Sequence, residues 1–248
     1  MIRTLTVLTL ALALTACDAA DSSDAAVPPT PIALAAFDAG TDAFPDAKHA
    51  GANYTNAAVR VGIVSTIVGL NLVLPALATE AATRRAPELV DGAFVWSNTV
   101  PIAGRQVDVR LTGDPRGSGV DWTLETAESG DAFFTFYSAR TTLDGRDGDW
   151  RLFNPERSGS VLTAAFDTDS ERDREITFAV PAGNDGAGSE VTYRVDGDTQ
   201  IFDFTDEPEG TRALIEWDLR TRAGSIVADG FNGGARACWN AALEDVAC

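Results

Sequence analysis

The sequence predicts an α+β fold in which one long buried N-terminal helix packs against, or is enclosed by, a highly curved antiparallel meander of about ten strands, as a half-barrel or barrel. From about Ala52 to Arg85 the chain is rich in strong helix formers, and residues 61–78 carry no charge. From about Ala93 to Gly230, short alternating apolar and polar runs are separated by turn residues. A helix that is apolar on every side has to be surrounded, and a meander with one apolar face can surround it.

The first 17 residues, MIRTLTVLTLALALTAC, have the layout of an export signal. Arg3 gives a short positive region, and residues 5–14 form an apolar stretch too short to span a bilayer. Leu14-Thr15-Ala16-Cys17 resembles the lipobox of bacterial lipoproteins. That resemblance implies a signal peptide over residues 1–16, removed before a diacylated Cys17. The alternative is an ordinary signal peptide that is cut near the same place.

The lipobox resemblance also implies a location and a partner. The protein is expected in the cell envelope, lipid-anchored to a membrane through Cys17, on the periplasmic side or at the cell surface. The resemblance leaves open whether the inner or the outer membrane holds it.

Residues 17–48 are expected to be the acylated cysteine and a flexible tether, because Pro28-Pro29 and Pro31 prevent regular helix. Ile32–Phe44 carries apolar residues and has the composition to dock locally. Residues 49–248 are expected to form a helix plus antiparallel β domain that ends in a disulfide loop.

The uncharged run over residues 61–78 marginally meets the length of a membrane span. We reject a span because it would return Cys238 and Cys248 to the reducing cytoplasm. The preferred interpretation is a helix buried all round inside its own domain, and the alternative is a helix that lies on the membrane.

Cysteine count and charge give further expectations. With Cys17 consumed by lipid, Cys238 and Cys248 remain as a pair that is expected to close a C-terminal disulfide loop. The net charge of −18 repels nucleic acid and anionic headgroups, so we expect no nucleic-acid partner.

Catalytic chemistry is not indicated, and we expect no enzyme activity, no catalytic residues, no cofactor and no metal site. The single histidine, His49, has no second histidine or neighbouring cysteine to build a triad or a metal centre. Asp167–Asp173 begins like an EF-hand loop but has Arg172 where glycine is needed and Phe178 where a bidentate glutamate is needed. Solvated hairpin loops explain this acidic segment.

Two functions remain open. The first is a structural or interaction lipoprotein that binds an envelope protein. The alternative is a carrier of an apolar or amphiphilic ligand, a lipid or acyl chain, held between the helix and the curved sheet. The possible ligand-facing residues are aromatic side chains expected on the concave face: Trp122, Phe134, Phe136, Trp150, Phe178 and Trp217. The same side chains also read as ordinary core.

Overall fold

A computed structural model describes residues 27–30, 50–102, 104–128, 130–156, 159–170 and 172–248, without the side chains of residues 70–74 and 102. The expected signal peptide, the lipid attachment site Cys17, His49 and most of the expected tether lie outside the described residues.

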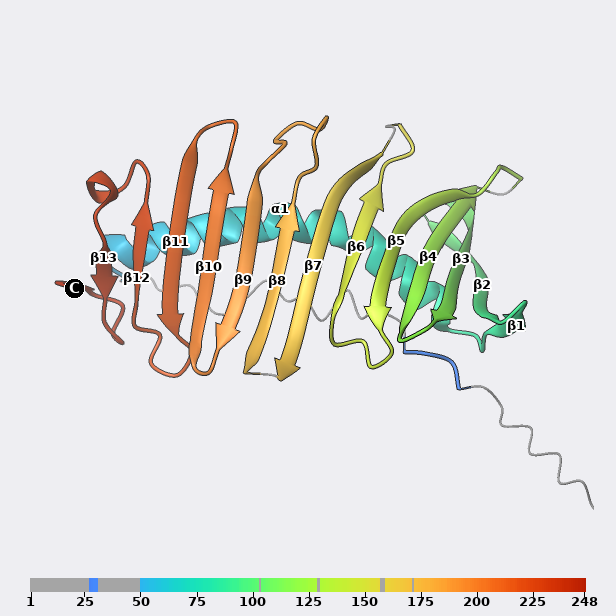
Figure 1. Cartoon of the computed structure of the whole chain (residues 1–248). Helices are drawn as coiled ribbons and strands as arrows, with labels where there is room; N and C mark the ends of the chain where they lie inside the picture. Colours follow the sequence, from blue (N-terminus) through green and yellow to red (C-terminus); the bar gives the residue numbers. More distant parts are fainter. Residues whose placement is uncertain (1–26, 31–49, 103, 129, 157–158, 171) are drawn as a thin grey trace, which may run out of the picture.

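The described domain is one antiparallel sheet with one long helix on a single side of it. Helix α1 (Ala52–Thr83) crosses behind the strands from the β13 end of the sheet to the β2 end (Figure 1). Its 32 residues correspond to a length of about 48 Å. Among the residues that the structure describes, no helix is long and apolar enough to cross a membrane.

The sheet is a meander of 14 strands, each hydrogen-bonded to the strands before and after it in the sequence. The strands are β1 (Glu88–Val90), β2 (Ala93–Ile102), β3 (Arg105–Arg116), β4 (Gly119–Glu128), β5 (Phe134–Thr142), β6 (Gly148–Phe153), β7 (Ser160–Ser170), β8 (Asp173–Ala179), β9 (Glu190–Asp196), β10 (Thr199–Asp206), β11 (Thr211–Asp218), β12 (Gly224–Ala228), β13 (Ala237–Trp239) and β14 (Asp245–Val246). Within the described chain β1 and β14 are the two edges, so the sheet is open.

The core lies between α1 and the sheet, because every second strand residue points toward the helix. In β11, Ala213, Ile215 and Trp217 are buried, while the residues between them are partly exposed. Close packing fixes some residue types: a Cβ at Gly113 of β3 would lie 2.8 Å from Cζ3 of Trp122 on β4. The alternation thus produces a single apolar side, and α1 covers it.

The start of α1 is held by the C-terminal segment rather than by a capping side chain of its own. Asp245 accepts hydrogen bonds from the backbone N–H groups of Ala52 (3.1 Å) and Asn53 (2.9 Å). The N–H of Gly51 donates to the carbonyl of Leu243 at 2.8 Å. A carboxylate at this position pairs with otherwise unsatisfied N–H groups and with the positive end of the helix dipole.

The predicted fold class is wrong. Among the described residues the sheet has 14 strands instead of about ten and is open, so the long helix α1 packs against one side of an open sheet and not against a barrel. The short strands β1, β13 and β14 have two or three residues each, too few for an alternating pattern to be recognised. Burial of α1 on every side is also wrong, because Val59, Ile63 and Ile67 are 54%, 57% and 57% exposed.

Candidate interaction surface on the outer side of the helix

The aromatic residues predicted to face a ligand are mostly packed in the core. Trp122, Trp150, Phe178 and Trp217 are between 1% and 3% exposed, and Phe134 and Phe136 of β5 are half-buried. Trp122 on β4 and Trp217 on β11 are seven strand spacings apart, or about 34 Å at a spacing of about 4.8 Å. The structure therefore spreads these side chains along the sheet and does not bring all six together.

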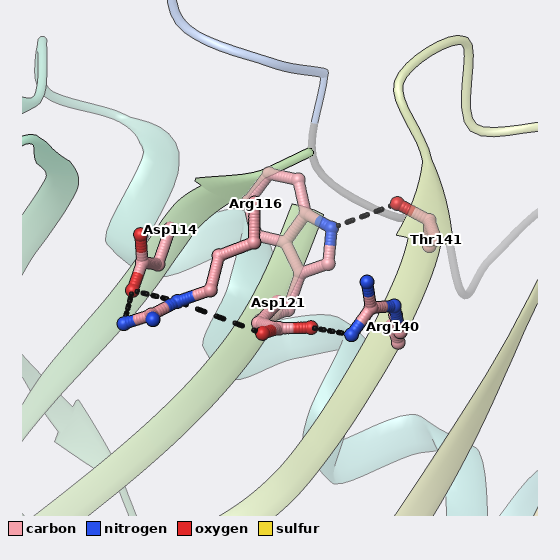
Figure 2. Close-up of polar contacts among 6 residues, drawn as sticks. Asp114, Arg116, Asp121, Arg140 and Thr141 are labelled. Carbon is pink, nitrogen blue, oxygen red and sulfur yellow. Dashed lines mark hydrogen bonds and ion pairs between the residues drawn. The ribbon is translucent and has the colours of Figure 1, made fainter. Parts of the chain in front are cut away.

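Each of the buried aromatic rings fills space against its neighbours. The ring centroids of Trp150 and Phe178 are 5.7 Å apart in an edge-on arrangement, and those of Trp122 and Trp96 are 6.0 Å apart. The indole N–H of Trp122 donates to the hydroxyl of Thr141 at 3.0 Å (Figure 2). Such contacts are those of a packed interior.

Two buried tyrosines connect the sheet to α1 by hydroxyl pairs. The hydroxyl of Tyr137 lies 3.1 Å from that of Thr79, and the hydroxyl of Tyr193 lies 2.8 Å from that of Ser65. Burial raises the pKa of Tyr137 to about 12 and the pKa of Tyr193 to about 12, from an ordinary value of 10.0. The phenols are held neutral, in a structural role.

These tyrosines give a testable pH dependence. Between pH 10 and 12 the unfolded chain releases both protons while the folded chain keeps them, so stability falls as pH rises in this window. Each tyrosine contributes a slope of up to about 1.4 kcal/mol per pH unit. Urea unfolding at pH 9 and pH 11 measures it. The variant with Tyr137→Phe and Tyr193→Phe should show a smaller loss than the wild type, and an equal loss in both proteins would refute this origin.

The side of the sheet away from α1 carries paired charges. Asp114, Arg116, Asp121 and Arg140 form a chain of ion pairs across β3, β4 and β5 (Figure 2). The Arg116–Asp114 pair is 2.6 Å long, and the Arg140–Asp121 pair is 3.4 Å long. Both arginine side chains are at least 60% exposed, so water screens the pairs and each contributes little to stability. The two aspartates and two arginines have a net charge of zero, so this cluster offers no net charge to attract a charged ligand.

The acidic turns of the described residues carry carboxylates that lie close to one another. The pKa of Asp167 is raised, first by the loss of hydration around its own carboxylate and then by repulsion from the neighbouring carboxylates of Asp147, Asp169 and Asp173. Within the described ranges, no group of three or more His, Cys, Asp or Glu side chains is placed to hold a metal ion.

The outer side of α1 is the most unusual surface of the domain. Val59, Ile63 and Ile67 follow one another at intervals of four residues and therefore lie on one side of the helix. Each is more than half exposed, as is Leu77 further along. On the opposite side, Ala57, Val61 and Val68 are at most 6% exposed. We call the four exposed residues Val59, Ile63, Ile67 and Leu77 the outer α1 surface.

A groove accompanies the first half of the outer α1 surface. Its volume is about 760 Å³, and it lies between α1 and Phe231, in the connection between β12 and β13. Arg60 forms part of its wall and donates to the backbone carbonyl of Asp229 at 3.2 Å. The lining residues are Ala50, Ala52, Thr55, Asn56, Val59, Arg60, Ile63 and Phe231. We call this hollow the α1 groove.

Sequence reasoning missed both features, although a signal was present. A helix that lies on one sheet can bury only one side, so apolar residues at 59, 63 and 67 cannot share the core with those at 57, 61 and 68. The error was to assume that the sheet surrounds the helix.

No protein-family model, curated protein or solved structure matches this chain.

Proposed function

We propose that this chain is a non-catalytic structural or interaction lipoprotein of the cell envelope, anchored in a membrane through Cys17. One observation favours this function over a lipid carrier. The predicted ligand-facing side chains are packed in the layer between α1 and the sheet: Trp122, Trp150, Phe178 and Trp217. A carrier needs those side chains to line a space that a lipid or acyl chain can enter.

The described ionisable groups support a non-catalytic role. The two groups whose pKa is raised furthest, Tyr137 and Tyr193, are buried and paired with hydroxyls of α1. A general acid or base has to reach a substrate, and buried groups in hydroxyl pairs are not placed to do so.

The charge of the domain makes a covalent anchor important. With a formal net charge of −18, the chain is repelled by anionic headgroups and gains nothing from electrostatic binding to them. Stable attachment then requires buried acyl chains, and two chains hold a protein where one does not. The diacylated cysteine implied by the lipobox resemblance of Leu14–Cys17 supplies such an anchor.

Replacement of the lipid attachment site tests this proposal. The full chain expressed in a bacterial host should fractionate with membranes, and its N-terminal peptide should carry acyl groups on Cys17. Cys17→Ser should be found in the soluble fraction without acyl groups. Cys238→Ser is the matched control and should stay with the membranes. Recovery of Cys17→Ser in the membrane fraction, or an unmodified Cys17 in the wild type, would contradict the anchor.

A further inference from the structure

At the β1 end of the open sheet, part of β2 has a neighbouring strand on one side only (Figure 1). β1 pairs with residues 93–95 of β2, whereas β3 pairs with β2 from Phe94 to Ile102. From Trp96 to Ile102, β2 therefore has β3 on one side and no described strand on the other. We call residues 96–102 the free edge of β2. Unpaired backbone groups on such an edge are a template for the addition of another strand.

The hairpin between β1 and β2 determines which residues of this edge face outward. Asp91 and Gly92 connect the strands, and both have positive φ, 51° and 87°, as a tight two-residue turn requires. The residue after such a turn donates its N–H to the carbonyl of the residue before it, so Ala93 directs its backbone groups toward β1. This direction alternates along an antiparallel strand. The residues of the free edge whose backbone groups point away from β3 are therefore Ser97, Thr99 and Pro101.

Pro101 removes one of the three outward positions as a donor. A proline nitrogen carries no hydrogen, so it cannot bond to an added strand. The sheet tolerates the proline because its nitrogen faces away from β3, where a missing N–H breaks no bond between β2 and β3. An added strand would lack a hydrogen bond at this position.

The side chain of Asn98 occupies a second donor. Its amide oxygen accepts a hydrogen bond from the N–H of Thr99 at 3.0 Å. Its amide nitrogen donates to the carbonyl of Ala81, in the last turn of α1, at 2.9 Å. Asn98 is thus held against the helix end while it covers the edge. A strand that needs the N–H of Thr99 has to break this local bond first.

The outermost strands of the sheet are short, which limits strand addition there as well. β1 has three residues and follows Pro87, and only Leu89 directs its backbone groups outward, because it lies between the two bonded pairs with β2. β14 has two residues, and Asp245 in it is bonded to the start of α1. Short strands and prolines are common protections of a sheet edge.

We propose that Pro101 and Asn98 close the free edge of β2 to strand addition, so that two copies of this sheet do not join edge to edge. Without these protections, positions 97, 99 and 101 would each offer an N–H and a carbonyl. Two copies could then pair antiparallel around a twofold axis at Thr99, with position 97 of one copy opposite position 101 of the other.

The closed edge has a consequence for the partner, and this consequence rests on the proposed function. An envelope protein that binds this lipoprotein has to contact side chains, because the free edge of β2 does not accept a strand from it. Closure is also important for copies anchored in one membrane, because the anchor concentrates them in a plane.

Association in solution tests the proposal. The starting protein is the full chain with Cys17→Ser, and Asn98→Ala combined with Pro101→Val removes both protections. In sedimentation equilibrium we expect a monomer for the starting chain and a dimer, with twice the mass, for the double variant. Pro101→Val alone keeps the Asn98 contact with α1, and it should dimerise only at higher concentration. The matched control is Pro208→Val, in the exposed turn between β10 and β11, which should stay monomeric.

Amide hydrogen exchange locates the contact. In the dimer of the double variant, exchange should slow at positions 97, 99 and 101 relative to the same variant diluted to monomer. The proposal is overturned if both Pro101→Val and the double variant stay monomeric, or if the dimer is protected elsewhere. It is also overturned if the starting chain already dimerises with Ser97 and Thr99 protected. If the double variant loses its fold by circular dichroism, Pro101→Val alone decides. None of these readouts involves lipid, so a failed anchor and a failed edge proposal are distinguishable.

Discussion

Replacing Trp122 with alanine is expected to lower the free energy of unfolding by about 3–5 kcal/mol. The side chain is 1% exposed, packs on Trp96 and donates its indole N–H to Thr141. Gly113 lies against the ring, so no side chain at that position is available to fill the space that the ring leaves. Equilibrium unfolding in urea, followed by circular dichroism, measures the loss.

The matched control is Phe133→Ala. Phe133 is also aromatic but is 41% exposed, with the guanidinium of Arg110 at 4.1 Å from its ring centroid. We expect its loss to cost about 1 kcal/mol or less. A loss as small as this for Trp122→Ala would mean that the ring lines open space, and it would favour the carrier alternative.

Removal of the disulfide is expected to cost about 2–4 kcal/mol and to loosen the start of α1. Cys238 and Cys248 are bonded across a sequence separation of 10 residues. The bond holds the segment that contains Leu243 and Asp245, which bind the first backbone N–H groups of the helix. The carbonyl of Cys238 also accepts a hydrogen bond from the side-chain amide of Asn53 at 2.8 Å.

The variant Cys248→Ser, compared with the wild type in urea unfolding and amide hydrogen exchange, measures this effect. Exchange should accelerate most at residues 51–55, because Asp245 no longer stays over the helix N-terminus. Asp245→Ala should reproduce part of the change, about 1 kcal/mol, with the disulfide intact. Cys17→Ser is the control and should leave stability unchanged. Unaltered exchange at residues 51–55 in Cys248→Ser would contradict the described link.

The antiparallel strands were predictable because their alternation is local. The run Val107–Leu111 lies in β3, Val120–Leu124 in β4 and Val191–Val195 in β9. Pairing between consecutive strands follows from the short turns between them. Strand number and closure depend on the whole sheet, and strands of two or three residues such as β14 leave no pattern to count.

The surroundings of α1 were harder to predict. Apolar composition shows that a helix surface avoids water, but it does not show whether a sheet, another segment or a partner covers each side. The prediction assumed that the sheet closes around the helix, whereas the side chains of Val59 and Ile63 are exposed on the side of α1 away from the sheet. For the buried tryptophans the sequence was ambiguous, because aromatic residues that line a ligand-binding surface and aromatic residues in a packed core have the same strand periodicity.

The central claim is that the layer between α1 and the sheet is filled by the protein's own side chains. A native mass spectrum of Cys17→Ser, purified from a lipid-containing host without detergent, tests it most directly. We predict the mass of the bare chain, lighter by two hydrogens for one disulfide. A reproducible additional mass that denaturation releases would contradict the claim and identify a carrier.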